Sequence, residues 1–393
     1  MGKLSMELYL KKLSKRYKAS TKSEKSLILK ELCETSGYHK KHAIRLLNTK
    51  PIKKSHKKKQ DRPKIYPDKA FLEPLKRIWF ISDQLCGKRL KMALPLWLPF
   101  YGDEYGHLDE KTYQGLLSMS PSTIDRLLRP CKVKSKRSLC GTKPGSILKK
   151  HIPIQTDQWN EAVPGYVEAD TVAHCGTSLS GDFVWSLTMT DIYSGWTELR
   201  AVWNKGATGI VEQVKHIEQS LPFAILGFDC DNGSEFLNWH LIRYFSNQEN
   251  QQRIQLTRSR PYHSNDNAHV EQKNWTHVRQ LFGYDRFDNQ HIVSLMNDLY
   301  VNEISMMNNY FLPNFKLIEK ERIDAKIVKK HSVPQTPYQR LIQSTAVSSE
   351  KKDELQKIYA ELNPFALHKA IQAKLKKVFA LVEVKSYKKM GYI

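Results

Sequence analysis

The order of strand and helix patterns between residues 165 and 282 is the feature that most constrains the fold. Three strand-like segments with short connections come first, which predicts an antiparallel meander. Segment 222–229 is an almost continuous apolar run, typical of a buried parallel strand. The expected strands are 166–172, 183–191, 196–203, 222–229 and 253–257, and the expected helices are 206–219, 235–244 and 267–282. This order predicts an α/β domain with a mixed five-stranded sheet and flanking helices.

Charge is distributed very unevenly along the 393 residues. Residues 1–150 hold 36 basic and 13 acidic side chains, so the whole net charge of +23 lies there, while residues 151–393 hold 27 of each. A basic arm on a neutral body indicates a polyanionic partner, most often nucleic acid. With 40% hydrophobic residues the chain can build proper cores, and its length indicates more than one domain.

Several classes are disfavoured by the composition. No apolar run reaches about 18 residues, so we expect no transmembrane helix, and the first residues lack the apolar core of a secretion signal. The six cysteines are scattered without a CxxC pair, which favours reduced thiols and disfavours a cysteine-built zinc site. We therefore expect a cytoplasmic protein, associated with the nucleoid if its partner is DNA.

The patterns divide the chain into six regions, from a helical front end to a mainly helical C-terminal region. The expected regions are a helix-turn-helix at 1–50, a basic linker at 51–65, a second helical module at 66–130, a second basic linker at 131–159, the α/β core at 160–285 and the C-terminal region at 286–393. For 66–130, a second DNA-binding module and a structural bundle are both open. For 286–393, a dimer contact, a DNA contact and a plain helical appendage are all open.

The front end has the outline of a helix-turn-helix, with a turn at Gly37. Its second helix, about 39–47, presents Lys40, Lys41 and Arg45, which suits a recognition helix in the major groove. The alternative is a helical hairpin with a solvated basic face. The basic run that follows contains Lys57, Lys58 and Lys59, either as a solvated linker or as phosphate contacts.

Three acidic residues of the core stand out by position. Asp170 lies in the first strand, Asp231 directly follows the apolar strand, and Glu271 lies in the first turns of the last helix. Carboxylates brought together in a sheet repel one another and need a divalent cation, and oxygen ligands select Mg²⁺ or Mn²⁺. Two such ions suit phosphodiester chemistry. Asp229 is a weaker candidate, and Glu235 is interpreted as a helix N-terminal charge.

The blocks around these acids are GYVEADT at 165–171, DNGSEF at 231–236 and PYHSNDNAHVE at 261–271. In order and spacing they resemble the integrase core, the ribonuclease-H-like DDE domain of retroviral integrases and bacterial insertion-sequence transposases. The resemblance covers about residues 160–285. It implies that Asp170, Asp231 and Glu271 form a catalytic triad that holds two Mg²⁺ or Mn²⁺ ions.

The insertion-sequence transposases are the closer match. This resemblance implies metal-dependent cleavage of DNA 3′ ends and strand transfer. It also implies that the partners are double-stranded DNA, as element ends and target, and further copies of the chain in an active homo-oligomer.

The sequence departs from the family where many members carry a Lys or Arg two turns after the glutamate, because Val278 stands there. Arg279 is the best substitute for a DNA contact, and Lys273 is a second candidate on the same helix. His263 and Asn265, in the polar loop before the helix, can reach phosphates, or the loop can be an ordinary helix start with Asn265 or Asn267 as its cap.

Two other functions remain open. One is a DNA-binding regulator with an inactive integrase-like core, which the full carboxylate set disfavours. The other is a ribonuclease-H-type nuclease, which the basic helical front end disfavours.

Overall fold

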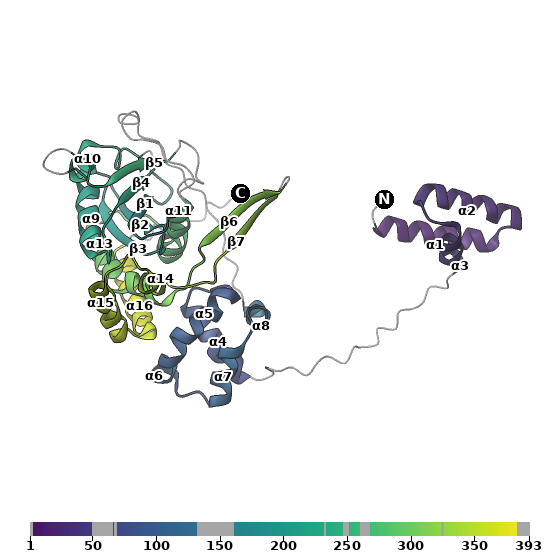
Figure 1. Cartoon of the computed structure of the whole chain (residues 1–393), viewed down its shortest axis with the longest axis horizontal. Coiled ribbons are helices and arrows are strands. Elements are labelled where there is room, and N and C mark those ends of the chain that lie inside the picture. Colours follow the sequence, from purple (N-terminus) through teal and green to yellow (C-terminus); the bar gives the residue numbers. More distant parts are fainter. Residues whose placement is uncertain are drawn as a thin grey trace, which may run out of the picture. The chain divides into compact units, whose positions relative to one another are not determined.

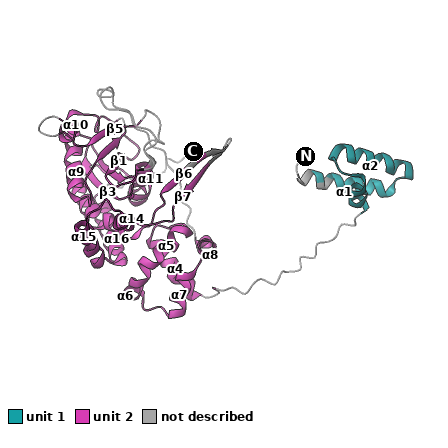
Figure 2. Ribbon diagram, viewed as in Figure 1, with its two compact units in different colours: residues 1–65 teal, residues 66–393 magenta. Residues whose placement is uncertain are grey.

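The computed structural model describes residues 3–48, 66, 69–131, 161–231, 233–246, 251–259, 268–323 and 326–382. The chain forms two compact units, residues 1–65 and 66–393 (Figure 2). In the described part of the chain, no helix has both the length and the apolar character needed to cross a membrane.

The first unit is a bundle of three helices, α1 (Lys3–Ala19), α2 (Lys22–Ser36) and α3 (Lys40–Asn48). A small apolar core holds them together, made of Leu13, Tyr17, Ile28, Leu29, Leu32, Ala43 and Leu47. Gly37 ends α2 with φ 69°, a left-handed conformation that glycine adopts without a Cβ clash. The expected helix–turn–helix outline is therefore present in α2, Gly37 and α3.

Residues 66–131 form the helical part that the sequence predicts. Its elements are α4 (Lys69–Ile81), α5 (Gly87–Trp97), η1 (Leu98–Phe100), α6 (Tyr101–Tyr105), α7 (Glu110–Ser118), α8 (Pro121–Leu128) and η2 (Arg129–Cys131). Ser120 caps α8 by accepting the N–H of Thr123 at 3.3 Å, and Pro121 occupies the first turn.

These helices belong to the second compact unit together with the core, which differs from the separate module expected at 66–130. The Trp97 indole donates to the carbonyl of Phe311 at 3.0 Å. Its ring packs edge-on against Phe365 with centroids 5.4 Å apart. Sequence patterns do not show such contacts, because the partners lie more than 200 residues away.

The predicted mixed five-stranded sheet is confirmed (Figure 1). Its strands are β1 (Tyr166–Ala173), β2 (Val184–Asp191), β3 (Thr197–Trp203), β4 (Gly227–Cys230) and β5 (Gln255–Arg258), in the order β3-β2-β1-β4-β5. β1, β2 and β3 pair antiparallel, whereas β4 pairs parallel with both β1 and β5. The carboxyl ends of β1, β4 and β5 therefore meet at one edge of the sheet.

The helices of the core follow the predicted order. They are α9 (Ala207–Ser220), α10 (Trp239–Tyr244) and a continuous helical stretch of α11 (Ala268–Lys273), η4 (Asn274–Arg279) and α12 (Gln280–Phe282). α11 packs on β1 and β2, and α9 packs on β3. The segment η4 is π-helical, a rare geometry that often occurs at functional sites.

Two boundaries differ from the sequence-based prediction by more than two residues. β4 begins only at Gly227, because the N–H of Leu226 donates to the carbonyl of Gly165 at 2.8 Å in the turn that precedes the strand. α10 begins at Trp239, because Asn238 caps it by accepting the N–H of Leu241 at 3.0 Å. Glu235 thus precedes α10, and the interpretation of Glu235 as a charge at the N-terminus of this helix is wrong.

The C-terminal region is mainly helical, as predicted. It contains α13 (His291–Leu299), the π-helical η5 (Tyr300–Ile304) and η6 (Met307–Phe311), α14 (Pro337–Gln343), α15 (Ser349–Glu361) and α16 (Pro364–Ala380). A hairpin of β6 (Leu317–Ile323) and β7 (Lys326–His331) was not predicted.

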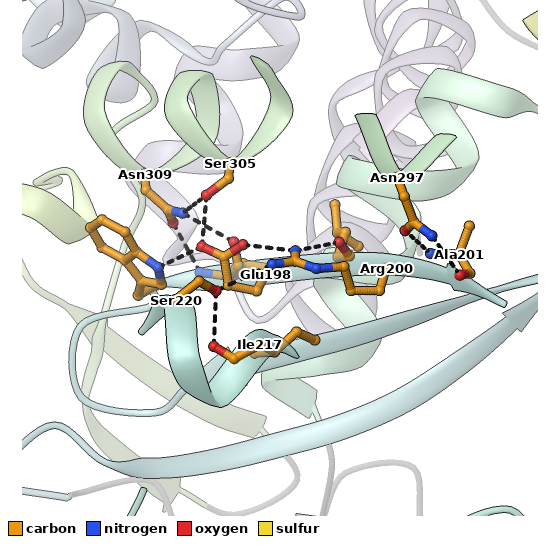
Figure 3. A network of polar contacts seen from close by, with 11 residues as sticks. Glu198, Arg200, Ala201, Ile217, Ser220, Asn297, Ser305 and Asn309 are labelled. Atoms are coloured by element: carbon orange, nitrogen blue, oxygen red, sulfur yellow. Dashed lines mark hydrogen bonds and ion pairs between the residues drawn. The ribbon is translucent and has the colours of Figure 1, made fainter. Parts of the chain in front are cut away.

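The helices of this region hold the edge strand β3 through side-chain amides (Figure 3). Asn297 accepts the N–H of Ala201 at 2.7 Å and donates to its carbonyl at 3.0 Å. Asn309 does the same with Thr197, at 2.9 and 3.0 Å. The two amides replace a neighbouring strand, so they satisfy backbone groups that a sheet edge otherwise exposes.

Candidate metal and nucleic-acid site

The pairing register of β1 and β4 places Asp170 beside Asp231. Glu168 pairs with Asp229 and Ala169 with Cys230, so one further step along both strands brings Asp170 and Asp231 together. Side chains two residues apart share one face of a sheet. Four carboxyl groups thus form a ladder on one face, with Glu168 and Asp229 buried inside, and Asp170 and Asp231 just beyond the last paired residues of β1 and β4.

The helix that carries Glu271 is fixed to this ladder at two points. The carboxylate of Glu168 accepts the N–H of Val270 at 3.0 Å, in the first turn of α11. Asn274 donates from Nδ2 to Oδ2 of Asp170 at 2.6 Å. Glu271 lies between these anchors, and its charge contributes to raising the pKa of Asp170.

The electrostatics of the site are those of a crowded set of acids. Burial, and then the charge of Asp231, raise the pKa of Asp170 to about 8. Burial raises the pKa of Asp231, and the charge of Glu235 raises it further. Burial alone raises the pKa of Glu271. The structure therefore brings the three predicted acids into one electrostatic group, in which a cation would relieve the repulsion.

Glu235 and Asn274, like the buried Glu168 of the ladder, were not predicted as site residues from the sequence. Glu235 is 1% exposed, forms an ion pair with Lys205 and accepts the hydroxyl of Thr171 at 3.0 Å. Asn274 is the donor to Asp170. Its spacing of three residues from Glu271 puts both on one helix face, which was a usable signal. Nothing in the local sequence indicated that Glu235 turns inward.

The donor atoms fit a hard divalent cation. Oδ1 of Asn274 and Oε2 of Glu235 are buried without a hydrogen-bond partner in the described part of the chain. Buried oxygen acceptors beside several carboxylates are ligands of the type that Mg²⁺ and Mn²⁺ prefer. Among the described residues, however, no three His, Cys, Asp or Glu side chains already stand in the arrangement of an assembled metal site.

The predicted DNA contacts fall in three groups. Lys40, Lys41 and Arg45 are all exposed on α3, and Lys41 and Arg45 lie on the side of the helix away from the buried Ala43 and Leu47. Lys57, Lys58, Lys59, His263 and Asn265 lie outside the described residues.

The third group lies on the helix that carries Glu271. The Nζ atom of Lys273 lies 3.3 Å from Nε2 of His277. Arg279 donates to the carbonyl of Ala173 at 2.9 Å and covers the ring of Tyr284. Because η4 is π-helical, the angle around the helix axis between Glu271 and Arg279 differs from the angle that an α-helix would give.

Known proteins were compared with the chain in three ways. No family model matches it. The uncharacterized protein y4rM of Sinorhizobium fredii (strain NBRC 101917 / NGR234) is 37% identical over 331 residues, which cover 83% of this chain and 91% of y4rM. The two chains belong to one family. The sequence similarity to y4rM thus extends well beyond the α/β core, over 83% of this chain.

Among solved structures, the catalytic core domain of BIV integrase aligns with 44% of this chain and 91% of its own length, at 14% identity and a TM-score of 0.27. The fold of this y4rM relative is described by its own strand order, β3-β2-β1-β4-β5.

Proposed function

We propose that this chain is a DDE transposase, a polynucleotidyl transferase that cuts the 3′ ends of its mobile element and joins them to target DNA. The observation that supports this best is the position of Asp170 and Asp231, side by side where the parallel pairing of β1 and β4 ends and faced by the helix of Glu271. Strand carboxyl ends are where sites form in open α/β sheets.

In this proposal Asp170, Asp231 and Glu271 hold two Mg²⁺ or Mn²⁺ ions, and Asn274 and Glu235 border them. When bound, such ions lower the pKa of an attacking hydroxyl or water and stabilise charge on the leaving oxygen. Asn274 orients Asp170 through its 2.6 Å hydrogen bond. Lys205 neutralises Glu235, which limits the negative charge that the site presents to a phosphodiester.

The chemistry needs two in-line displacements. Water first attacks the phosphorus at the element end, so a P–O bond forms, the P–O3′ bond breaks and a 3′-hydroxyl is released. That hydroxyl then attacks a target phosphorus and displaces the target 3′-oxygen. Protons pass to solvent, and no covalent enzyme intermediate is required.

DNA binding is proposed to involve both units. In unit 1 the contacts are Lys40, Lys41 and Arg45 on α3, with the basic run of Lys57, Lys58 and Lys59. In unit 2 they are His263, Asn265, Lys273 and Arg279. Double-stranded DNA, as element ends and target, is the proposed substrate, and a homo-oligomer is the proposed active form.

The test compares Asp231→Asn with the wild type on duplexes cut from the DNA that flanks the coding region. In Mg²⁺, the variant should bind these duplexes normally but lose nicking and strand transfer. Asp353→Asn, at an exposed position of α15, is the matched control and should keep full activity. Nicking by Asp231→Asn at the wild-type rate would refute the triad.

Substrate controls separate the alternatives. Cleavage of an RNA–DNA hybrid without strand transfer would identify a nuclease. Binding without any metal-dependent cleavage by the wild type would identify a regulator.

A further inference from the structure

A cavity of about 60 Å³ lies against the helix of Glu271 and is distinct from the carboxylate ladder. Four cationic side chains from four different segments line it: Arg89 of α5, Lys273 of α11, Lys316 just before β6 and Arg340 of α14. No acidic side chain lines it within the described part of the chain. Segments far apart in the sequence thus converge to build one cationic cavity.

The four cations contact only neutral acceptors among the described residues. Arg89 donates from Nε to the carbonyl of Pro313 at 2.5 Å. Lys316 donates to the carbonyl of Glu161 at 3.1 Å. Arg340 donates to the carbonyls of Ser194 at 2.7 Å and Asn314 at 2.6 Å. Lys273 contacts only the imidazole of His277.

Among the described residues, no carboxylate therefore pairs directly with these four cations. Asp83 acts electrostatically on Arg89, and Asp191 and Glu161 act on Lys316. Asp191 already accepts hydrogen bonds from the N–H groups of Ser194 at 2.7 Å and Gly165 at 2.8 Å. Buried like charges of this kind are costly unless an anion joins them.

Asn314 supplies a further donor to the same cavity. Its Oδ1 accepts from Arg340, which fixes the orientation of the amide, and its Nδ2 is buried without a partner in the described residues. Gly195 also lines the cavity, and a Cβ there would come within 3.0 Å of this Nδ2. Glycine thus leaves the amide N–H groups accessible to a bound acceptor.

We propose that this cavity is a phosphate-binding site. Its volume suits about four water-sized atoms, which is close to the size of one phosphate group. Guanidinium and ammonium groups with an amide N–H₂ offer donors alone, the lining that phosphate oxygens require. Under the proposed function, on which this step rests, the phosphate belongs to a DNA backbone held on the opposite side of the helix from the metal site.

The first experiment uses the full chain and inorganic phosphate. The thermal unfolding midpoint is measured in phosphate and in chloride at equal ionic strength. Phosphate also stabilises proteins by exclusion, so the comparison is among variants. The wild type and Lys357→Gln, an exposed lysine of α15, should gain the same increase, and Lys316→Gln should lose most of it.

The second experiment measures the salt dependence of duplex DNA binding. Losing one phosphate contact should make the slope of log K against log salt shallower by about 0.9. We expect this in Lys316→Gln and Lys273→Gln but not in Lys357→Gln. A lost phosphate response with an unchanged slope supports the site with free phosphate as its ligand.

The proposed site would be refuted if Lys316→Gln and Lys357→Gln showed the same phosphate-induced increase in unfolding midpoint and the same slope of log K against log salt. As a folding control, Lys316→Gln should unfold in chloride at the same midpoint as the wild type. If the wild type responds to phosphate but never cleaves DNA, the proposed function fails while the phosphate site stands.

Discussion

At the scale of single residues, Asn274 is the contact that orients Asp170. One amide N–H at 2.6 Å holds the carboxyl group, and ligands of a metal depend on such partners for their orientation. Asn274→Ala should therefore reduce metal-dependent cleavage about 10–100-fold and increase the metal concentration needed for half-maximal rate. DNA affinity in the absence of metal should not change.

Asn302→Ala is the matched control for this prediction, because Asn302 makes an exposed hydrogen bond to Asp298 at 2.7 Å. An Asn274→Ala variant with the wild-type rate and metal dependence would show that Asp170 needs no partner.

His174 gives the molecule a pH dependence of stability. Burial, and then the charge of Arg279, lower its pKa to about 3, and the ring hydrogen-bonds Ser186 at 2.7 Å and stacks on Phe287. Below about pH 6.5, the unfolded chain binds a proton that the folded chain does not. Stability attributable to His174 is thus present above that pH and is lost as the pH falls towards 3.

The prediction is that His174→Gln flattens the acid limb of the stability curve by about 1.4 kcal/mol per pH unit between pH 4 and 6. Urea unfolding at each pH measures this slope. The exposed His291 is the control, and His291→Gln should keep the wild-type slope. Identical slopes for all three proteins would mean that His174 is protonated in the folded state.

The sequence predicted the residues whose position along a strand or helix determines their place. Asp170 follows from its place in the first strand, Asp231 from the end of the apolar strand, and Glu271 from the helix start. Glu235 could not be predicted, because its inward orientation depends on Lys205 and Thr171, which are distant in sequence. The cationic cavity could not be predicted from the sequence either, because the four cationic side chains that line it come from four separate segments.

At the scale of elements, Glu168 connects β1 to the helix of Glu271. Its carboxylate accepts the N–H of Val270 at the open end of α11, where backbone N–H groups lack helical partners. Glu168→Ala should loosen this turn, lower the cleavage rate and speed amide exchange at Val270. Glu168→Gln keeps an acceptor oxygen and should restore both.

Unchanged exchange at Val270 in Glu168→Ala would show that the helix start is held by other contacts. A loss of activity in Glu168→Gln with normal exchange would instead assign Glu168 a role beyond positioning.

The amides on the edge of β3 are a second link between elements. Asn309 is fully buried and makes two hydrogen bonds to the backbone of Thr197. Asn309→Ala leaves these backbone groups without partners, so the free energy of unfolding should fall by about 1–3 kcal/mol. Urea unfolding checks this, with Asn302→Ala expected within about 0.5 kcal/mol of the wild type.

Elements with strong periodicity were predicted well, whereas the hairpin of β6 and β7 was not. Its strands are rich in charged residues, for example Glu319, Lys320, Lys329 and Lys330. A strand signal requires an apolar face, and little of this hairpin has one. The start of α10 was missed because the cap at Asn238 was not recognised.

At the scale of the whole molecule, the basic front of the chain is divided between two units. Residues 1–65 carry 20 basic and 5 acidic side chains and form a unit of their own. Residues 66–131 pack into the same unit as the core through Trp97. The sequence pattern placed the boundary in the basic linker at 131–159, because composition does not report packing.

A chain that begins at residue 66 should therefore fold, with a cooperative unfolding transition like that of the full chain. Its DNA binding should be weaker and less dependent on salt, because the phosphate contacts of residues 1–65 are gone. A chain that begins at residue 160 should fold poorly, since it exposes the surface around Phe311 and Phe365. Circular dichroism and gel shifts over a salt series measure both.

Full stability of the chain from residue 160 would contradict this packing argument. An unchanged salt slope of the chain from residue 66 would contradict the proposed DNA contacts of unit 1.

The π-helical segment between Asn274 and Arg279 has a consequence for how the family can vary. Asn274 reaches Asp170 at one point of β1, and Arg279 reaches the carbonyl of Ala173 three residues further along. The helix is thus attached to the strand by hydrogen bonds at two points. Insertion or deletion of a single residue between Asn274 and Arg279 would break one of these two attachments, so natural length variation should avoid this interval.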